Sequence, residues 1–307
     1  MKKLGFLLSL TTNDNDYQME QAAAGEETAR RAGVELRILY ADNDAINQSQ
    51  QLLKIIQSSS ESRPDAIILE PAGSTALPQV ARAAAAAGIG WVILNREADY
   101  VADLRRDYRV PVFAVTSDHV EIGRIQGRQM KALLPEGGSV LYIQGPAGSD
   151  AAQQRTDGMQ QTKPDNLQAR LLRAQWTEGS AFQSVSGWLR LSTSRELRMD
   201  LVSAQDDSMA MGARKAFQEI SDAQLRDRWL RLPFTGCDGM PKTGQAWVRS
   251  GLLAATIVVP PNAGLAVEML AKTISGAAMP AERTFVDARS FPAIEELAKP
   301  RAKKRPV

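Results

Sequence analysis

The sequence has one cysteine, Cys237, and one histidine, His119, among its 307 residues. A single cysteine excludes an intramolecular disulfide, and a cysteine after an apolar run is expected to be a small buried side chain. His119 falls at a predicted helix start and far from Cys237, so we expect it to be exposed and find neither a Ser-His-Asp nor a Cys-His arrangement. These absences argue against an enzyme that uses a serine or cysteine nucleophile.

Other motifs and signals are also missing. There is no Gly-x-x-x-x-Gly-Lys phosphate loop, no Cys/His metal cluster and no EF-hand loop, so we expect no catalytic residues, no metal and no cofactor. No apolar run approaches the roughly 20 residues that a spanning helix needs, so no membrane insertion is expected. The apolar start at Leu4–Leu10 lacks the cleavage site of a secretory leader and favours a first strand.

The charge is nearly balanced. The chain has 37 basic and 35 acidic residues, a net charge of +2, and the last nine positions are rich in basic side chains, as expected of a solvated tail. Nothing in this balance indicates nucleic acid as a partner. A helix-turn-helix ahead of the first strand, which a DNA-binding regulator would need, is not expected either.

Short apolar runs alternate with helical patterns along the whole chain, as in a series of strand–helix–strand units. Runs that stay apolar throughout are typical of parallel strands buried on both faces. About ten such runs predict an α/β fold with two parallel sheets of about five strands each. The runs are Leu4–Leu10, Val34–Tyr40, Ala66–Leu69, Trp91–Leu94, Val112–Val115, Val140–Ile143, Leu171–Ala174, Leu201–Ala204, Leu230–Thr235 and Ala254–Val259.

Side chains that form hydrogen bonds follow most of these strands. Ligands of open α/β sheets bind outside the carboxyl ends of the strands, so we expect a cleft lined by loops from two facing sheets. The candidate ligand-binding residues are Asn15, Tyr17, Glu70, Asn95, Arg96, Arg155, Trp176, Asp206 and Asp238.

The chemistry of this set suits a polyhydroxylated ligand. Carboxylates accept hydrogen bonds, guanidinium groups donate them, and the amide of asparagine does both. Three carboxylates, Glu70, Asp206 and Asp238, stand against two arginines, Arg96 and Arg155, which favours a neutral sugar, a polyol or a weakly cationic amino sugar over an anion.

Structural roles remain open for the same residues. The arginines and Asp238 can form internal ion pairs, Asn15 and Asp206 can hydrogen-bond nearby backbone, and Trp176 can pack within a lobe.

Six stretches in order resemble the type I periplasmic binding proteins, the ribose-binding-protein-like sugar-binding proteins of ABC transporters, whose fold is shared by the effector domains of lactose-repressor-like regulators. The resemblance runs from about Leu4 to about Arg289. The stretches are Ile93–Arg96, Thr116–Asp118, Gln144–Gly148 leading to Arg155, Ala204–Gly212, Gly236–Gly239 and Gly251–Ile257.

The resemblance implies two Rossmann-like lobes joined by a three-stranded hinge, with chain crossings near Ser117, Val259 and Ala288. It implies an N-terminal lobe of residues 1–117 plus 260–288 and a C-terminal lobe of residues 118–259 plus 289–307. In that family, the positions of Asn15, Tyr17, Arg96, Arg155, Asp206 and Asp238 contact the sugar.

The resemblance also implies a function and a setting. We expect a monomeric solute-binding protein that delivers a sugar or polyol to an ABC permease; the alternative is a ligand sensor that signals to a receptor or another regulatory partner. A periplasmic location follows from the resemblance, and a cytoplasmic one is the alternative, because the sequence shows no leader. Asn95 stands where ribose binders carry aspartate and Glu70 where a neutral residue is common, so ribose itself is not expected.

Overall fold

The computed structural model describes residues 3–73 and 75–298, and the chain divides into two compact units. The first unit comprises Met1–Asp118, Gly148–Ala151 and Pro260–Asp287, and the second comprises His119–Ala147, Ala152–Val259 and Ala288–Val307. The basic tail at positions 299–307 lies outside the described residues.

The first unit is built on a six-stranded parallel sheet with the order β11-β5-β4-β3-β1-β2. Its central strands are apolar and buried on both faces, as a parallel sheet covered by helices requires. The strands are β1 (Gly5–Leu10), β2 (Glu35–Tyr40), β3 (Ala66–Leu69), β4 (Gly90–Leu94), β5 (Val112–Ser117) and β11 (Arg283–Val286).

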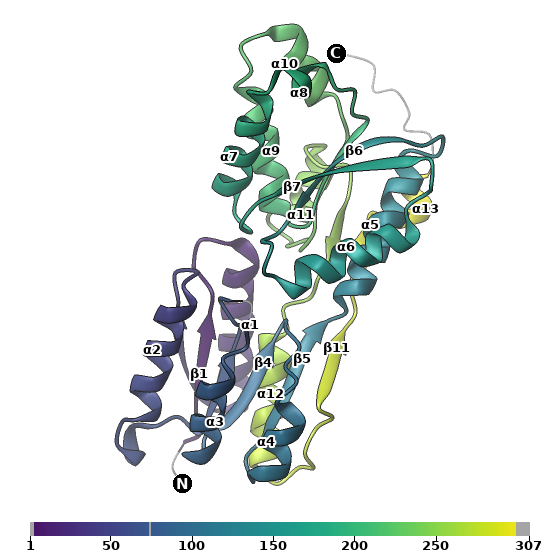
Figure 1. The fold of residues 1–307 in the computed structure, drawn as a ribbon. Coiled ribbons are helices and arrows are strands. Elements are labelled where there is room, and N and C mark those ends of the chain that lie inside the picture. Colours follow the sequence, from purple (N-terminus) through teal and green to yellow (C-terminus); the bar gives the residue numbers. More distant parts are fainter. Residues whose placement is uncertain (1–2, 74, 299–307) are drawn as a thin grey trace. The chain divides into compact units, whose positions relative to one another are not determined.

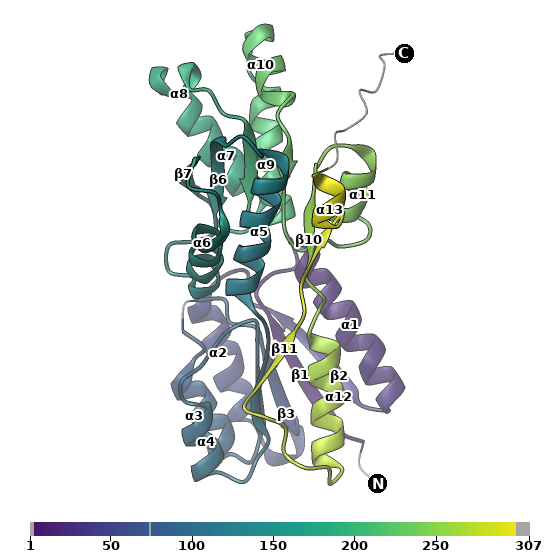
Figure 2. The same ribbon diagram turned by 90° about the vertical axis from the view of Figure 1, so that its right-hand side faces the viewer.

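Helices cover both faces of this sheet (Figure 2). Phe6 and Leu8 of β1 pack with α1 (Asp16–Ala32) and α12 (Ala263–Ile274). Leu7 points to the other face, where the core contains side chains of three further helices. Those helices are α2 (Ala45–Ile56), α3 (Pro78–Ala86) and α4 (Val101–Asp107), and a short 3-10 helix, η1 (Ser60–Ser62), precedes β3.

The second unit has a four-stranded parallel sheet with the order β7-β6-β8-β9 and a separate antiparallel pair, β10 with β12. The strands are β6 (Gly138–Gln144), β7 (Leu167–Arg173), β8 (Leu201–Ala204), β9 (Phe234–Thr235), β10 (Thr256–Val258) and β12 (Arg289–Phe291).

Helices α7 (Glu178–Leu189) and α9 (Asp207–Gln218) pack on one face of β6 and β7, and α5 (His119–Leu133) and α6 (Asp150–Thr162) pack on the other (Figure 1). Four short helices complete the unit: α8 (Ser192–Glu196), α10 (Ala223–Leu230), α11 (Gly244–Ser250) and α13 (Ile294–Leu297). No helix among the described residues combines the length and the apolar character needed to cross a bilayer.

The predicted fold class is confirmed: the chain is an α/β protein with parallel sheets, and every predicted apolar run contains or overlaps a strand. The two parallel sheets have six and four strands rather than about five each, and β10 and β12 form a separate pair. The run predicted at Leu230–Thr235 is largely not a strand, because Leu230 ends α10 and only Phe234–Thr235 pairs with β8. The helix expected after Asp118 is α5, but His119 in its first turn is 5% exposed, which corrects the expectation of an exposed ring.

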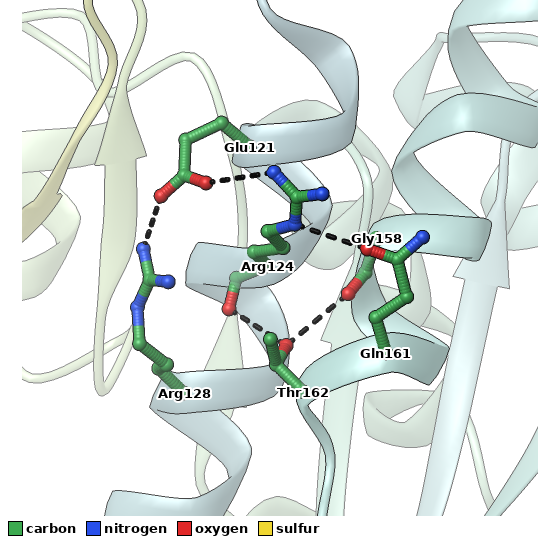
Figure 3. A network of polar contacts seen from close by, with 6 residues as sticks. All are labelled: Glu121, Arg124, Arg128, Gly158, Gln161 and Thr162. Atoms are coloured by element: carbon green, nitrogen blue, oxygen red, sulfur yellow. Dashed lines mark hydrogen bonds and ion pairs between the residues drawn. The ribbon is translucent and has the colours of Figure 1, made fainter.

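Glycines allow α5 and α6 to approach closely. A Cβ added at Gly123 would lie 2.0 Å from the carbonyl oxygen of Arg155, and one at Gly158 would lie 2.0 Å from the carbonyl oxygen of Val120. Side chains then bridge the two helices: the Nε of Arg124 donates to Gln161 at 3.0 Å (Figure 3). The backbone of α6, which carries Arg155, is therefore fixed against α5.

Replacing Gly158 with alanine should destabilise the protein, because the new methyl group cannot fit against the backbone of α5. We expect Gly158→Ala to cost at least 1–3 kcal/mol, roughly the range for overpacked sites, measured by urea unfolding. Gly187→Ala is the matched control, since nothing lies within 4 Å of the position that its new methyl group would take in α7; it should be neutral or stabilising by about 0.4–1 kcal/mol. Equal stability of the two variants would contradict the close helix crossing.

Candidate functional site

Polar side chains at the carboxyl ends of β3 and β4 form a buried network in the first unit. Glu70 follows β3 directly, and its carboxylate accepts from the side-chain amides of Gln21 on α1 and Asn95 after β4, both at 3.1 Å. The amide of Asn95 also donates to the hydroxyl of Tyr17 at 3.1 Å. The network thus joins three predicted site residues, Tyr17, Glu70 and Asn95, in one cluster.

Two residues that were not predicted hold this cluster together. Asn262 accepts from Gln21 at 2.7 Å and donates to Asn95 Oδ1 at 2.7 Å. Gln21 accepts from the backbone N–H of Ala263 at 2.8 Å, so α1 and α12 are tied at this point. Both side chains are fully buried. A glutamine within a helix and an asparagine before one carry no distinctive sequence signal.

Glu70 is the buried charge of this unit. Burial raises the pKa of its carboxyl, and the nearby Arg96 and the hydrogen bonds from Asn95 and Gln21 lower it only in part, so the net shift is upward. Arg96 is half-buried and donates through Nη1 to the carbonyl oxygen of Asn95 at 2.8 Å. The first unit therefore presents one carboxylate and one guanidinium at the same sheet edge.

Asn15 has a structural role at this edge. Its Oδ1 accepts from the backbone N–H of Gln18 at 3.2 Å and caps the start of α1. The cap orients the first turn, which places Tyr17 over the end of the sheet.

Glu70 should make the stability of the protein depend on pH. A carboxyl whose folded pKa lies above its unfolded value stabilises the fold at low pH, and that contribution is lost as pH rises through the folded pKa. We therefore expect the free energy of unfolding of Glu70→Gln to increase relative to that of the wild type as the pH rises above about 4.5, because only the wild type loses stability there. Glu27→Gln on the exposed side of α1 is the control and should show no such trend. A pH-independent difference would contradict the burial of a charge at Glu70.

Arg155 is the central side chain of the second unit. It lies on α6, is 7% exposed, and donates through Nη1 to the carbonyl oxygen of Gln205. Its guanidinium carbon lies 5.4 Å from the centroid of the Trp176 ring. Its Nε is buried and has no hydrogen-bond partner among the described residues. A buried donor without an acceptor is costly, so this atom is an exception to the usual pairing of buried polar groups.

Two predicted carboxylates lie beside Arg155. Asp206 follows β8, and its Oδ1 caps α9 by accepting from the backbone N–H of Met209 at 2.9 Å. Asp238 follows β9, is half-buried, and interacts with Asp206 through a hydrogen bond. Burial and then Asp206 raise the pKa of Asp238, and Arg155 opposes the shift. The three side chains form one electrostatically coupled group.

Asp207 and Gln205 hold the loops beside Arg155, Asp206 and Asp238 in place. Asp207 accepts from the backbone N–H of Gly239 and from the hydroxyl of Thr256, both at 2.7 Å, and so fixes the loop that carries Asp238. Gln205 accepts from the backbone N–H of Gly145 at 2.9 Å. The sequence places both beside Asp206, but adjacency alone does not reveal that they support the loops rather than face a ligand.

Trp176 packs within its own unit, as the structural alternative allowed. A Cβ added at Gly145 would lie 2.2 Å from its ring, so the glycine makes room for the indole. The ring also lies beside the Arg155 guanidinium.

Three of the predicted site residues have a left-handed backbone. The φ angles are +55° at Asn95, +62° at Trp176 and +102° at Asp238. Such conformations cost about 1–3 kcal/mol in non-glycine residues and persist where the surroundings fix them. All three positions lie within three residues of the end of a strand, β4, β7 or β9.

The predicted residues divide between the units: Asn15, Tyr17, Glu70, Asn95 and Arg96 lie in the first, and Arg155, Trp176, Asp206 and Asp238 lie in the second. Within the part of the chain that the structure describes, no group of three or more histidine, cysteine, aspartate or glutamate side chains is arranged to hold a metal ion.

The chain is similar to known proteins along most of its length. Residues 6–278 match the family model of the periplasmic binding protein domain. The ribose import binding protein of Salmonella typhimurium is 27% identical over 278 residues, which cover 90% of this chain and 86% of that protein.

Two solved structures are similar over 96% of this chain. One is an ABC transporter periplasmic solute binding protein from Actinobacillus succinogenes with bound D-allose, with a TM-score of 0.79, 22% identity and 99% of its chain covered. The other is an ABC transporter solute binding protein from Bacillus halodurans with bound myo-inositol, with a TM-score of 0.77, 22% identity and 97% of its chain covered. At this identity, the likeness shows the fold.

Proposed function

The chain belongs to the periplasmic binding protein domain family, and we propose that it captures a sugar or polyol for an ABC importer. The observation that carries this proposal is the set of buried and half-buried donors and acceptors at the carboxyl ends of the strands in each unit. They are centred on Glu70 and Asn95 in the first unit and on Arg155 and Asp238 in the second. Relatives that bind ribose, D-allose and myo-inositol support the ligand class.

The side chains match the needs of hydroxyl groups. Each hydroxyl donates once and accepts twice, so a polyol needs carboxylate, amide and guanidinium partners together. Trp176 supplies a flat apolar face for the C–H side of a ring.

We propose that the ligand contacts both units and thereby favours a closed state. The proposed lobes are residues 1–117 plus 260–288 and residues 118–259 plus 289–307, joined by crossings near Ser117, Val259 and Ala288. A ligand shifts a conformational equilibrium only by its differential affinity for the two states, so contacts with both lobes would drive hinge closure.

We propose no chemical transformation of the ligand, because the sequence offers neither a Ser-His-Asp nor a Cys-His arrangement. The proposed partner is a permease or a sensor receptor that recognises the ligand-bound form. The proposed setting is the periplasm, and the proposed state is a monomer, in keeping with the family.

The first test is thermal unfolding with a panel of sugars and polyols. A ligand at about 1,000 times its dissociation constant should add ~4 kcal/mol to the free energy of unfolding.

With the best panel member, Arg155→Ala should weaken binding by about 2 kcal/mol, since a charge-assisted hydrogen bond is lost, measured by titration calorimetry. Arg170→Ala, at an exposed position of β7, is the control. Unchanged affinity in Arg155→Ala would remove Arg155 from the site.

A further inference from the structure

The strand β11 leaves one edge of the sheet of the first unit open. It comes first in the strand order and pairs only with β5 among the described residues (Figure 1). The backbone N–H of Ala114 in β5 donates to the carbonyl oxygen of Glu282 at 2.8 Å, and the direction of the backbone groups alternates from there along the strand. The backbone groups of Arg283 and Phe285 therefore point to the open edge, and Asp287 follows in the same alternation.

The same three residues carry exposed side chains. Phe285 is 49% exposed, Arg283 and Asp287 are exposed as well, and Thr284 and Val286 between them are half-buried. The guanidinium carbon of Arg283 lies 5.7 Å from the centroid of the Phe285 ring, so both side chains lie on one face of the strand. An open edge of this kind is a template for pairing with another strand.

The order of these side chains is self-complementary. A basic, an aromatic and an acidic residue stand two positions apart. In an antiparallel copy centred on Phe285, each Arg283 lies opposite the Asp287 of the other strand, and Phe285 lies opposite Phe285. All three positions have outward-pointing backbone groups, so each opposed pair would exchange both of its N–H···O bonds.

Other arrangements of the two edges lose this match. A parallel copy would bring Arg283 close to Arg283 and Asp287 close to Asp287, and like charges in neighbouring strands are destabilising. Shifting the antiparallel register by one residue sets outward-pointing backbone groups against inward-pointing ones. Shifting it by two residues separates Arg283 from Asp287. The sequence of the edge thus selects one register.

We propose that the open edge of β11 pairs with the same edge of a second copy of this chain, antiparallel and centred on Phe285. Cross-strand pairs of aromatic side chains and of opposite charges stabilise such a ladder. Arg283 also pairs with Glu97 of its own chain at 3.0 Å, between exposed side chains. Its planar fork of donors can serve the carboxylate of Asp287 from the second copy as well.

This contact is small, so the pairing should be weak. A stable interface buries roughly 1,200–2,000 Å², which residues 283–287 of two copies do not reach. The dilute protein therefore remains the proposed monomer, and the second copy binds at high protein concentration. The inference goes beyond the proposed function and does not rest on it.

The first measurement is sedimentation equilibrium of the full chain from about 1 μM to about 1 mM, a range that covers the dissociation constants of weak complexes. The apparent mass should rise from that of a monomer towards that of a dimer. A monomer mass at every concentration would contradict the proposal.

A charge exchange tests which residues face each other. Arg283→Glu should weaken association on the order of 10-fold, because carboxylates would then oppose each other in both pairs. Adding Asp287→Arg reverses each pair and should restore association. Arg37→Glu, at an exposed position of β2 on the opposite edge of the sheet, is the control and should change nothing. A double variant as weak as Arg283→Glu would show that these residues do not oppose each other.

Disulfide crosslinking tests the register directly. The Cα atoms of a hydrogen-bonded antiparallel pair lie about 5.5 Å apart, within the roughly 4.4–6.8 Å that a disulfide spans. The only native cysteine, Cys237, is buried, so oxidation of Phe285→Cys should give a covalent dimer. Thr284→Cys is the matched control, because its Cα would lie diagonally from its counterpart at roughly 7–8 Å. Equal crosslinking of the two variants, or none in Phe285→Cys, would overturn the proposed pairing.

Discussion

The burial of charged side chains is the constraint on which the site depends. Glu70 and Arg155 lose most of their contact with water, and each therefore needs partners supplied by the fold or by a ligand. In the first unit the fold supplies them: Gln21 and Asn95 donate to Glu70, and Asn262 holds both amides in place. In the second unit the supply is incomplete, because Arg155 keeps a buried Nε without an acceptor among the described residues.

The sheets explain why these groups gather where they do. Parallel strands covered on both faces accept apolar side chains along their length, so polar residues are confined to the loops that follow them. Glycines then set how closely the supporting elements approach. Gly123 and Gly158 bring α5 against α6, and Gly145 makes room for Trp176, which lies beside Arg155. The position of the Arg155 guanidinium thus depends on these three glycines.

Much of the architecture follows from the sequence because buried parallel strands are continuous apolar runs. Ala66–Leu69 and Leu201–Ala204 coincide with β3 and β8. Prediction is weaker at sheet edges: β7 has only its first residue, Leu167, buried and begins earlier than its apolar run. The strands β11 and β12 are short and half-exposed, and were missed.

The site is predictable in part because the end of each buried strand can be located from the end of its apolar run. Residues directly after a strand, such as Glu70, Asn95 and Asp238, are identified by position. The helix residue Gln21 and the loop residue Asn262 are not, because their role appears only when α1 and α12 pack together. Likewise, the left-handed backbone of Trp176 and Asp238 was not predicted from the sequence.

The most direct test of the central claim is a crystal structure of the protein with a ligand identified by thermal unfolding. We predict a single bound molecule that contacts Arg155 and Asp238 in the second unit and the cluster of Glu70, Asn95 and Tyr17 in the first. A ligand that touches only one unit, or that lies away from the carboxyl ends of both sheets, would contradict this.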